Sequence, residues 1–221
     1  GVLGTLSPDD DRRKHYGVIN YLATHHYYLW SPLEATVLIP ISVLGISYFE
    51  FLSTVAPLLL TVIGFTLYRI FFILSEDDIE IKRVEQKKAK FSPFANIKWD
   101  VLIFVGIVIL ISNLLKIHSQ DITDYFMRFN SNLLTGSLIA FVASFILGSS
   151  SKFAGITTML TVVFGLNYFP LFFALGYSGY LISPTHKCLV ITKRYFNTQV
   201  EIYQVLSILI LSLVTVGYLS I

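Results

Sequence analysis

Charged side chains are scarce in this sequence. Of its 221 residues, 14% are Asp, Glu, Lys or Arg, whereas a soluble domain usually carries about 25%. Hydrophobic residues make up 54% of the chain and fall in several long runs. This combination predicts an integral membrane protein. The formal net charge of +2 is too small to indicate a nucleic-acid partner, and no basic patch with interleaved aromatic residues is present.

Cysteine is almost absent as well. The single Cys188 excludes an internal disulfide framework and a thiolate metal cluster. His25 and His26 are adjacent, so a helix would not direct both at one ion, and neither a metal site nor a cofactor is expected. The sequence contains no Ser-His-Asp grouping, no His-Glu-x-x-His motif and no phosphate-binding glycine loop. A non-enzymatic protein is therefore predicted.

The first thirty residues mix charge with aromatic side chains. Tyr, Trp and His crowd together at residues 21–30, where a polar segment meets an apolar one. Amphipathic rings of this kind favour the headgroup level of a membrane. Residues 1–30 are therefore predicted to form an interfacial arm or linker helix. The chain begins with Gly1, and we expect it to be part of a longer protein.

Residues 31–221 are predicted to form one all-α polytopic membrane repeat of about five spans plus a re-entrant helical hairpin. A span needs roughly 20 apolar residues. The apolar segments correspond to spans at about 32–50, 54–74, 101–117 and 200–219, a hairpin at 132–166 and a broken span at 168–196. The two halves of the hairpin are short for full spans, but two spans remain the alternative. A short surface helix is expected at 119–130.

The orientation follows from the basic residues of the short loops. The loop at 75–98 is richest in Lys and Arg, and such loops stay on the cytoplasmic side. The basic clusters at 12–14 and 193–194 then fall on the same side, and the C-terminus lies outside. The sequence thus predicts a multi-pass protein of the inner (cytoplasmic) cell membrane.

Two polar interruptions lie within the apolar C-terminal part. The first is Gly148-Ser149-Ser150-Ser151-Lys152, between two short apolar helices. Gly148 can end one helix in a left-handed conformation and a serine can cap the next. The free N–H groups of that helix start, with the serine hydroxyls and Lys152, would suit an anion, and exposed carbonyls would suit Na⁺. The alternative is a simple turn outside the membrane.

The second interruption combines small, hydroxyl-bearing and helix-breaking residues. Proline removes a backbone donor and disfavours helix at the preceding residue, which frees carbonyls upstream. His186 can carry a proton near neutral pH. In the alternative interpretation, the Gly-x-x-Gly face at 176–179 serves close helix packing. The candidate substrate- or ion-binding residues here are Ser178, Gly179, Ser183, Pro184, Thr185 and His186.

The order of these parts resembles the C-terminal repeat of the ion transporter superfamily, which includes dicarboxylate, citrate and gluconate carriers. The stretch 176–192 is similar to a pattern in an uncharacterised family of archaeal and bacterial integral membrane proteins placed in that superfamily. The resemblance implies that the tip at 148–151 and the break at 179–185 hold substrate and sodium. It also implies an inverted second half outside this sequence, a homodimer, and a location in the membrane of an archaeon or bacterium. The usual carrier tip is Ser-Asn-Thr, whereas this chain has Ser149-Ser150-Ser151.

Together these features predict a secondary active transporter of a small anion, an organic acid by the resemblance, coupled to Na⁺ or H⁺ and working by alternating access. Its expected partners are the lipid bilayer and the missing N-terminal half, with no nucleic acid. One alternative is a non-transporting membrane scaffold subunit of a larger complex. An intramembrane enzyme is a less favoured alternative.

Overall fold

The computed structural model describes residues 13–72, 132–198 and 200–221, with a few isolated positions between 110 and 124. All regular structure in these ranges is helical, which confirms the predicted all-α class for this part of the chain. The predicted loop at 75–98 and nearly all of the predicted segments 101–117 and 119–130 lie outside the described residues. The helices are α1 (Arg13–Ala23), α2 (Ala35–Leu44), α3 (Tyr48–Phe72), α6 (Leu133–Leu147), α7 (Ser150–Phe164), α8 (Phe169–Leu181), α9 (Lys187–Phe196) and α10 (Glu201–Leu219), with 3₁₀ turns η1 (His26–Leu29) and η3 (Leu166–Tyr168).

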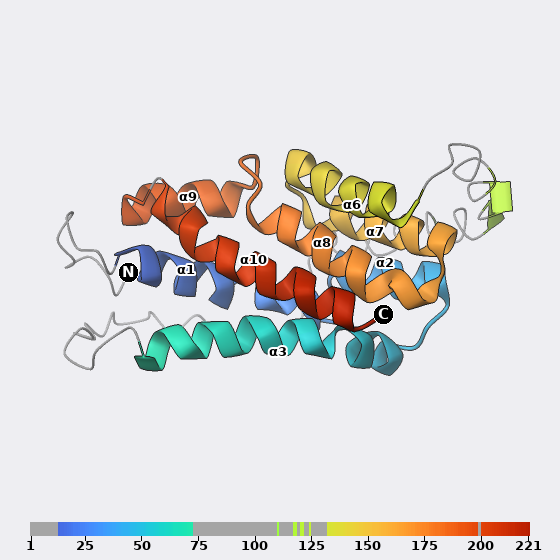
Figure 1. Cartoon of the computed structure of the whole chain (residues 1–221), viewed down its shortest axis with the longest axis horizontal. Helices are drawn as coiled ribbons and strands as arrows, with labels where there is room; N and C mark the ends of the chain where they lie inside the picture. Colours follow the sequence, from blue (N-terminus) through green and yellow to red (C-terminus); the bar gives the residue numbers. More distant parts are fainter. Residues whose placement is uncertain are drawn as a thin grey trace, which may run out of the picture.

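Helix α8 lies at the centre of the bundle. All of its residues except Leu175 are buried, and α6, α7 and α10 pack around it (Figure 1). Its aromatic side chains Phe169, Phe173 and Tyr177 join the main hydrophobic core. A helix that is apolar on all sides needs such complete cover by neighbours, so α8 sets the positions of the elements around it.

Among the described helices, α3 and α10 are long and apolar enough to cross a bilayer by length and composition, with 25 and 19 residues. They correspond to the predicted spans at 54–74 and 200–219. Both run along the length of the bundle (Figure 1) and expose large apolar side chains, among them Leu60 on α3 and Leu211 on α10. Helices α2, α6 and α7 are apolar but shorter. This composition is compatible with membrane association.

The predicted span at 32–50 is wrong, because two separate helices occupy this segment. Helix α2 has only ten residues and ends at Gly45, which takes a left-handed conformation (φ 69°) that terminates the helix. A reciprocal capping box then starts α3. The Ser47 N–H donates to Glu50 Oε2 (2.6 Å), and the Glu50 N–H donates to Ser47 Oγ (3.2 Å).

The described part of the predicted interfacial arm belongs to the bundle interior. Val18, Tyr21 and Leu22 of α1 and Leu29 of η1 are buried in the main core. Helix α1 packs against α9, α10 and α3. Residues 13–30 are therefore packed into the bundle by one face, and their position at a membrane interface stays a prediction.

The predicted hairpin and broken span both appear as helix interruptions. Helices α6 and α7 have 15 residues each, are joined only by Gly148 and Ser149, and pack against each other. Each is about 22 Å long, less than a bilayer core of about 30 Å. The predicted span at 168–196 consists of α8 and α9, separated by residues 182–186.

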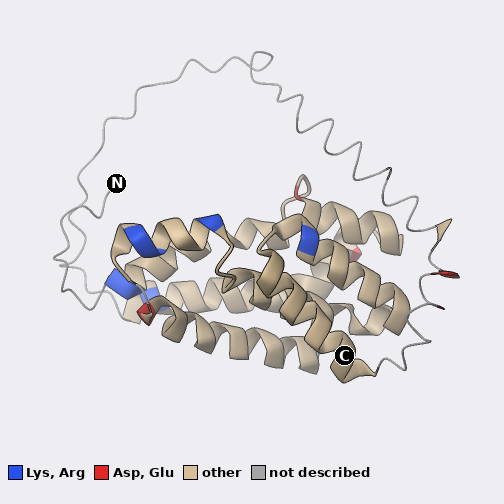
Figure 2. Cartoon of the chain, turned by 90° about the horizontal axis from the view of Figure 1, so that it is seen from above, with Lys and Arg blue, Asp and Glu red and all other residues tan. Residues whose placement is uncertain are grey.

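Basic side chains gather at one end of the described part (Figure 2). Helix α1 starts there with Arg13 and Lys14, and α9 ends there with Lys193 and Arg194. Arg69, in the last turn of α3, makes a hydrogen bond to His15 Nδ1 (2.6 Å). This bond fixes the end of α3 beside the start of α1.

Candidate functional site

Three helix interruptions meet halfway along the bundle. Helices α1 and α9 occupy one end of the molecule, whereas α2, α6 and α7 occupy the other (Figure 1). Each interruption therefore comes at the boundary between these two ends. The contacts described below join them into one region, here called the junction, which comprises residues 24–25, 148–149 and 182–186.

The hairpin tip touches the second interruption directly. The Thr185 hydroxyl donates to the Ile146 carbonyl (3.1 Å) in the last turn of α6. Gly148 has φ +53°, the left-handed conformation predicted for it, and a Cβ there would collide with Thr185 Oγ1 and Ser183 Oγ. Glycine thus serves both the backbone conformation and the close approach of the two segments.

Tyrosine hydroxyls satisfy backbone carbonyls around the junction. Tyr21 of α1 donates to the Leu181 carbonyl at the end of α8 (2.8 Å), and Tyr177 donates to the His25 carbonyl (3.1 Å). Both bonds are buried and join segments more than 150 residues apart in sequence. Buried non-helical backbone requires such partners. A tyrosine of α1 thus satisfies a carbonyl at the end of α8, and a tyrosine of α8 satisfies a carbonyl just after α1.

Replacement of Tyr21 by phenylalanine should test this support. The substitution removes one hydroxyl and leaves the buried Leu181 carbonyl without its donor, which costs about 1–3 kcal/mol. The matched control is Tyr195→Phe, because Tyr195 is exposed on α9. Thermal unfolding of the two variants in detergent measures the difference. Equal melting temperatures would contradict the proposed role of the Tyr21 hydroxyl.

Two helix N-termini open onto the junction. Helix α7 starts after Ser149 and α9 after His186, and neither N-cap side chain makes a capping hydrogen bond. Ser149 occupies the predicted cap position, but its hydroxyl contacts Ser151 Oγ instead (3.3 Å). Neither first turn carries an acidic residue, and each carries one exposed lysine, Lys152 or Lys187. Helix N-termini and lysines together make this region electropositive.

The predicted site residues fall into three groups by exposure. Ser149, Ser150 and Ser151 are half-buried, whereas Lys152, Pro184 and Thr185 are exposed. Ser178, Ser183 and His186 are buried. The Ser178 hydroxyl, like those of Ser144 and Thr158, has no hydrogen-bond partner among the described residues.

Close helix packing accounts for Gly179. A Cβ at this position would collide with the Phe141 carbonyl oxygen and lie 3.1 Å from the Phe145 nitrogen, both in the backbone of α6. Gly176 likewise faces Thr157 Cγ2 of α7. The Gly-x-x-Gly face thus corresponds to the packing alternative.

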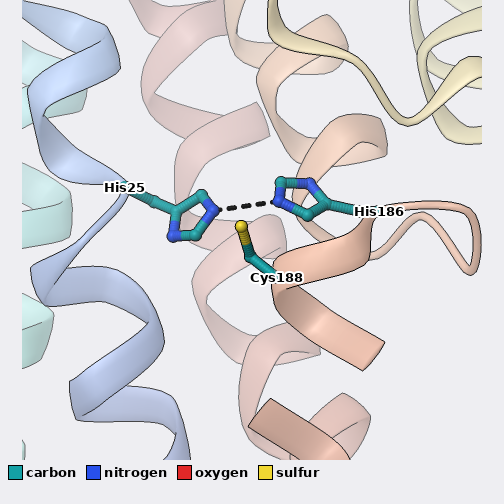
Figure 3. Close-up of side chains that lie close together, drawn as sticks. All are labelled: His25, His186 and Cys188. Atoms are coloured by element: carbon teal, nitrogen blue, oxygen red, sulfur yellow. Dashed lines mark hydrogen bonds between the residues drawn. The ribbon is translucent and has the colours of Figure 1, made fainter. Parts of the chain in front are cut away.

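Sequence reasoning missed a cluster of two histidines and a cysteine among the described residues. His25 Nε2 and His186 Nε2 lie 3.0 Å apart, and Cys188 Sγ points toward the space between the two rings (Figure 3). The possible ligand atoms of the three residues all lie within 4.8 Å of one another. Since His25 and His186 are 161 positions apart, local spacing carried no signal for their contact. In the sequence, only the two-residue spacing of His186 and Cys188 could have indicated this cluster.

Aromatic rings enclose the two histidines. Tyr21 and Tyr28 lie with ring centroids 4.1 and 5.5 Å from that of His25, and the Tyr180 centroid lies 4.3 Å from that of His186. His25 is 1% exposed and His186 is 4% exposed, so the surrounding rings close the pair off from solvent.

A separate cavity lies away from the junction. It encloses about 350 Å³ between α3, the loop before α8 and the C-terminus. Its polar lining includes Glu50, Thr54 and Asn167, and none of the predicted site residues borders it. The cavity and the junction are therefore distinct features.

Comparison with known proteins does not extend these observations. The expected resemblance to the ion transporter superfamily concerns the order of elements over most of the chain and the motif at 176–192. The family assignment stays a prediction, since no protein-family model, curated protein or solved structure matches the chain.

Proposed function

We propose that this chain forms part of a secondary active membrane transporter of a small anion. The observation that carries the proposal is the junction, where the interruption at 182–186 contacts both the hairpin tip and the segment after α1. Discontinuous helices that meet near mid-membrane form the substrate sites of many secondary transporters. A scaffold subunit has no need for interruptions that converge in this way.

The proposed membrane location agrees with the surfaces of the bundle. Helices α3 and α10 have apolar outer faces, and hydrocarbon tolerates irregular backbone only where protein or a water-filled cavity surrounds it. The carbonyls of Leu181 and His25 receive buried tyrosine hydroxyls. By the positive-inside rule, the basic end formed by α1 and α9 would face the cytoplasm (Figure 2).

An anion is the substrate class that fits the electrostatics best. The N-termini of α7 and α9 start at the junction, and Lys152 and Lys187 lie in their first turns. Uncapped helix N-termini offer N–H groups to carboxylates, and the half-buried serines of the tip offer hydroxyl donors. The organic acid and the coupling to Na⁺ or H⁺ follow from the resemblance to the superfamily.

Labelling of single cysteines in intact membranes tests the proposal. In a Cys188→Ala background, Ser149→Cys and Ser150→Cys should react with a membrane-impermeant maleimide, because a transport site is open to water. Citrate or succinate should slow the reaction. Leu211→Cys is the matched control, since Leu211 is 71% exposed in the middle of the apolar α10 and would face lipid.

Two results would contradict the proposed function. In the first, the cysteines at positions 149 and 150 react as little as Leu211→Cys. This result would mean that the hairpin tip is packed against protein and closed to water, which favours the scaffold interpretation. The second is labelling that a broad panel of organic anions leaves unchanged, together with no uptake of radiolabelled citrate or succinate by proteoliposomes containing the full-length protein.

A further inference from the structure

The cluster of His25, His186 and Cys188 has the ligand types of a zinc site. Imidazole nitrogen and thiolate sulfur are the ligands that Zn²⁺ prefers, whereas Mg²⁺ and Ca²⁺ prefer oxygen. Two residues come from the second interruption and the start of α9, and the third comes from the segment after α1. The cluster therefore bridges two elements that only the tertiary fold brings together.

The spacing of the ligand atoms is close to that of a tetrahedral ion. With Zn–N bonds of about 2.0–2.1 Å, two nitrogens on one zinc lie roughly 3.4 Å apart. The two Nε2 atoms are 3.0 Å apart, so a small outward rotation of one ring would admit the ion. Cys188 is exposed, which leaves its side chain free to change rotamer and close the remaining distance to the two nitrogens.

The hydrogen bond at His25 Nδ1 leaves Nε2 of the same ring available as a metal ligand. Its Nδ1 lies 2.6 Å from the Tyr21 carbonyl, and a carbonyl can only accept, so Nδ1 carries the proton. In the tautomer with its proton on Nδ1, the His25 ring presents the Nε2 lone pair to His186. Metal-binding histidines usually show this arrangement, with the second nitrogen donating to a carbonyl or carboxylate.

The same pair is poorly satisfied as a simple histidine–histidine hydrogen bond. Because His25 Nε2 can only accept, a direct histidine–histidine hydrogen bond requires His186 to donate from its own Nε2, the atom that also lies 3.4 Å from the Tyr180 hydroxyl. The Nδ1 atom of His186 is then a bare acceptor. That Nδ1 is buried and has no hydrogen-bond partner among the described residues, in a side chain that is 4% exposed. A cation between the two Nε2 atoms would take the place of this proton, and the neutral His186 ring would then carry its proton on Nδ1.

We propose that His25, His186 and Cys188 bind a Zn²⁺ ion, with a fourth coordination position open to water on the exposed side of Cys188. Three protein ligands and one open position are typical of zinc sites that bind or exchange a further ligand. Zinc would lock the segment after α1 to the start of α9 across the junction. This inference does not depend on the transport proposal.

Metal titration of the full chain, purified in detergent and stripped with chelator, tests the site. Added Co²⁺ should produce the absorption bands of tetrahedral cobalt and a thiolate-to-cobalt charge-transfer band, and Zn²⁺ should displace it. Cys188→Ser should remove the charge-transfer band and weaken Zn²⁺ binding at least about tenfold. Because Cys188 is exposed, this variant should keep the helical circular dichroism and size-exclusion profile of the parent.

Two further variants separate the site from adventitious binding. His25→Gln should weaken Zn²⁺ binding to a similar extent, whereas His26→Gln, which changes the neighbouring histidine, should leave it unchanged. Zn²⁺ should also raise the melting temperature of the parent and of His26→Gln only. Six-coordinate cobalt spectra, a charge-transfer band that persists in Cys188→Ser, or equal losses in His25→Gln and His26→Gln would each overturn the proposal.

Discussion

Replacement of Gly179 by alanine should destabilise the fold by about 3 kcal/mol, at the upper end of the range for overpacking. The added methyl group would collide with the Phe141 carbonyl oxygen and crowd the Phe145 nitrogen. Both atoms belong to the backbone of α6, so no side-chain rotation relieves the contact. Helix α6 would have to move away from α8, the buried centre of the bundle. Thermal unfolding and the monodisperse fraction on size exclusion in detergent measure this loss.

The matched control is Gly155→Ala, which makes the same change inside α7. A Cβ at Gly155 meets nothing within 4 Å, and alanine has the higher helix propensity. This variant should therefore be neutral or more stable by up to about 1 kcal/mol. If the two variants melt at the same temperature, close α6–α8 packing does not explain the glycine at position 179.

The interruptions were predictable because glycine and proline mark them locally. Gly148 ends α6 in the predicted left-handed conformation, and Pro184 lies in the break between α8 and α9. The last predicted segment, 200–219, differs from α10 by one residue at its start. These features depend on short-range backbone preferences, which a single sequence displays directly.

The split of residues 32–50 was also visible locally, but hydropathy obscured it. The segment is apolar throughout, so its length alone indicated one span. Gly45 and the Ser47-x-x-Glu50 pattern were stronger signals, because a left-handed glycine followed by a capping box ends one helix and starts another. A capping interaction therefore outweighed hydrophobic length at this position.

The contacts that define the junction were not predictable in the same way. Tyr21 reaches Leu181 and His25 reaches His186 across 160 and 161 positions. From the sequence alone, the aromatic residues of α1 could equally be membrane-interface anchors or buried donors to carbonyls, because amphipathic rings suit both environments. Tertiary packing decided between these environments.

Replacement of Gly148 by alanine should cost about 2–4 kcal/mol, from left-handed backbone strain and from collision at the hairpin tip. Gly148 has φ +53°, and its Cβ would meet Thr185 Oγ1 and Ser183 Oγ. Unlike Gly179, it faces side-chain hydroxyls, so a second substitution can relieve part of the collision. Unfolding in detergent, with the Gly155→Ala variant as reference, measures the total cost.

A double-mutant cycle with Thr185→Ala separates the two contributions. Thr185→Ala alone should lose only the hydrogen bond to the Ile146 carbonyl, about 0.5–1.5 kcal/mol. In the double variant the collision with Oγ1 is gone, whereas the backbone strain, the Ser183 contact and the close approach to the His186 backbone nitrogen (3.0 Å) remain. Its cost should therefore fall below the sum of the single costs by about 1 kcal/mol. Strict additivity would mean that the tip and the α8–α9 break are not in contact, and the transport site proposed at the junction would lose its structural basis.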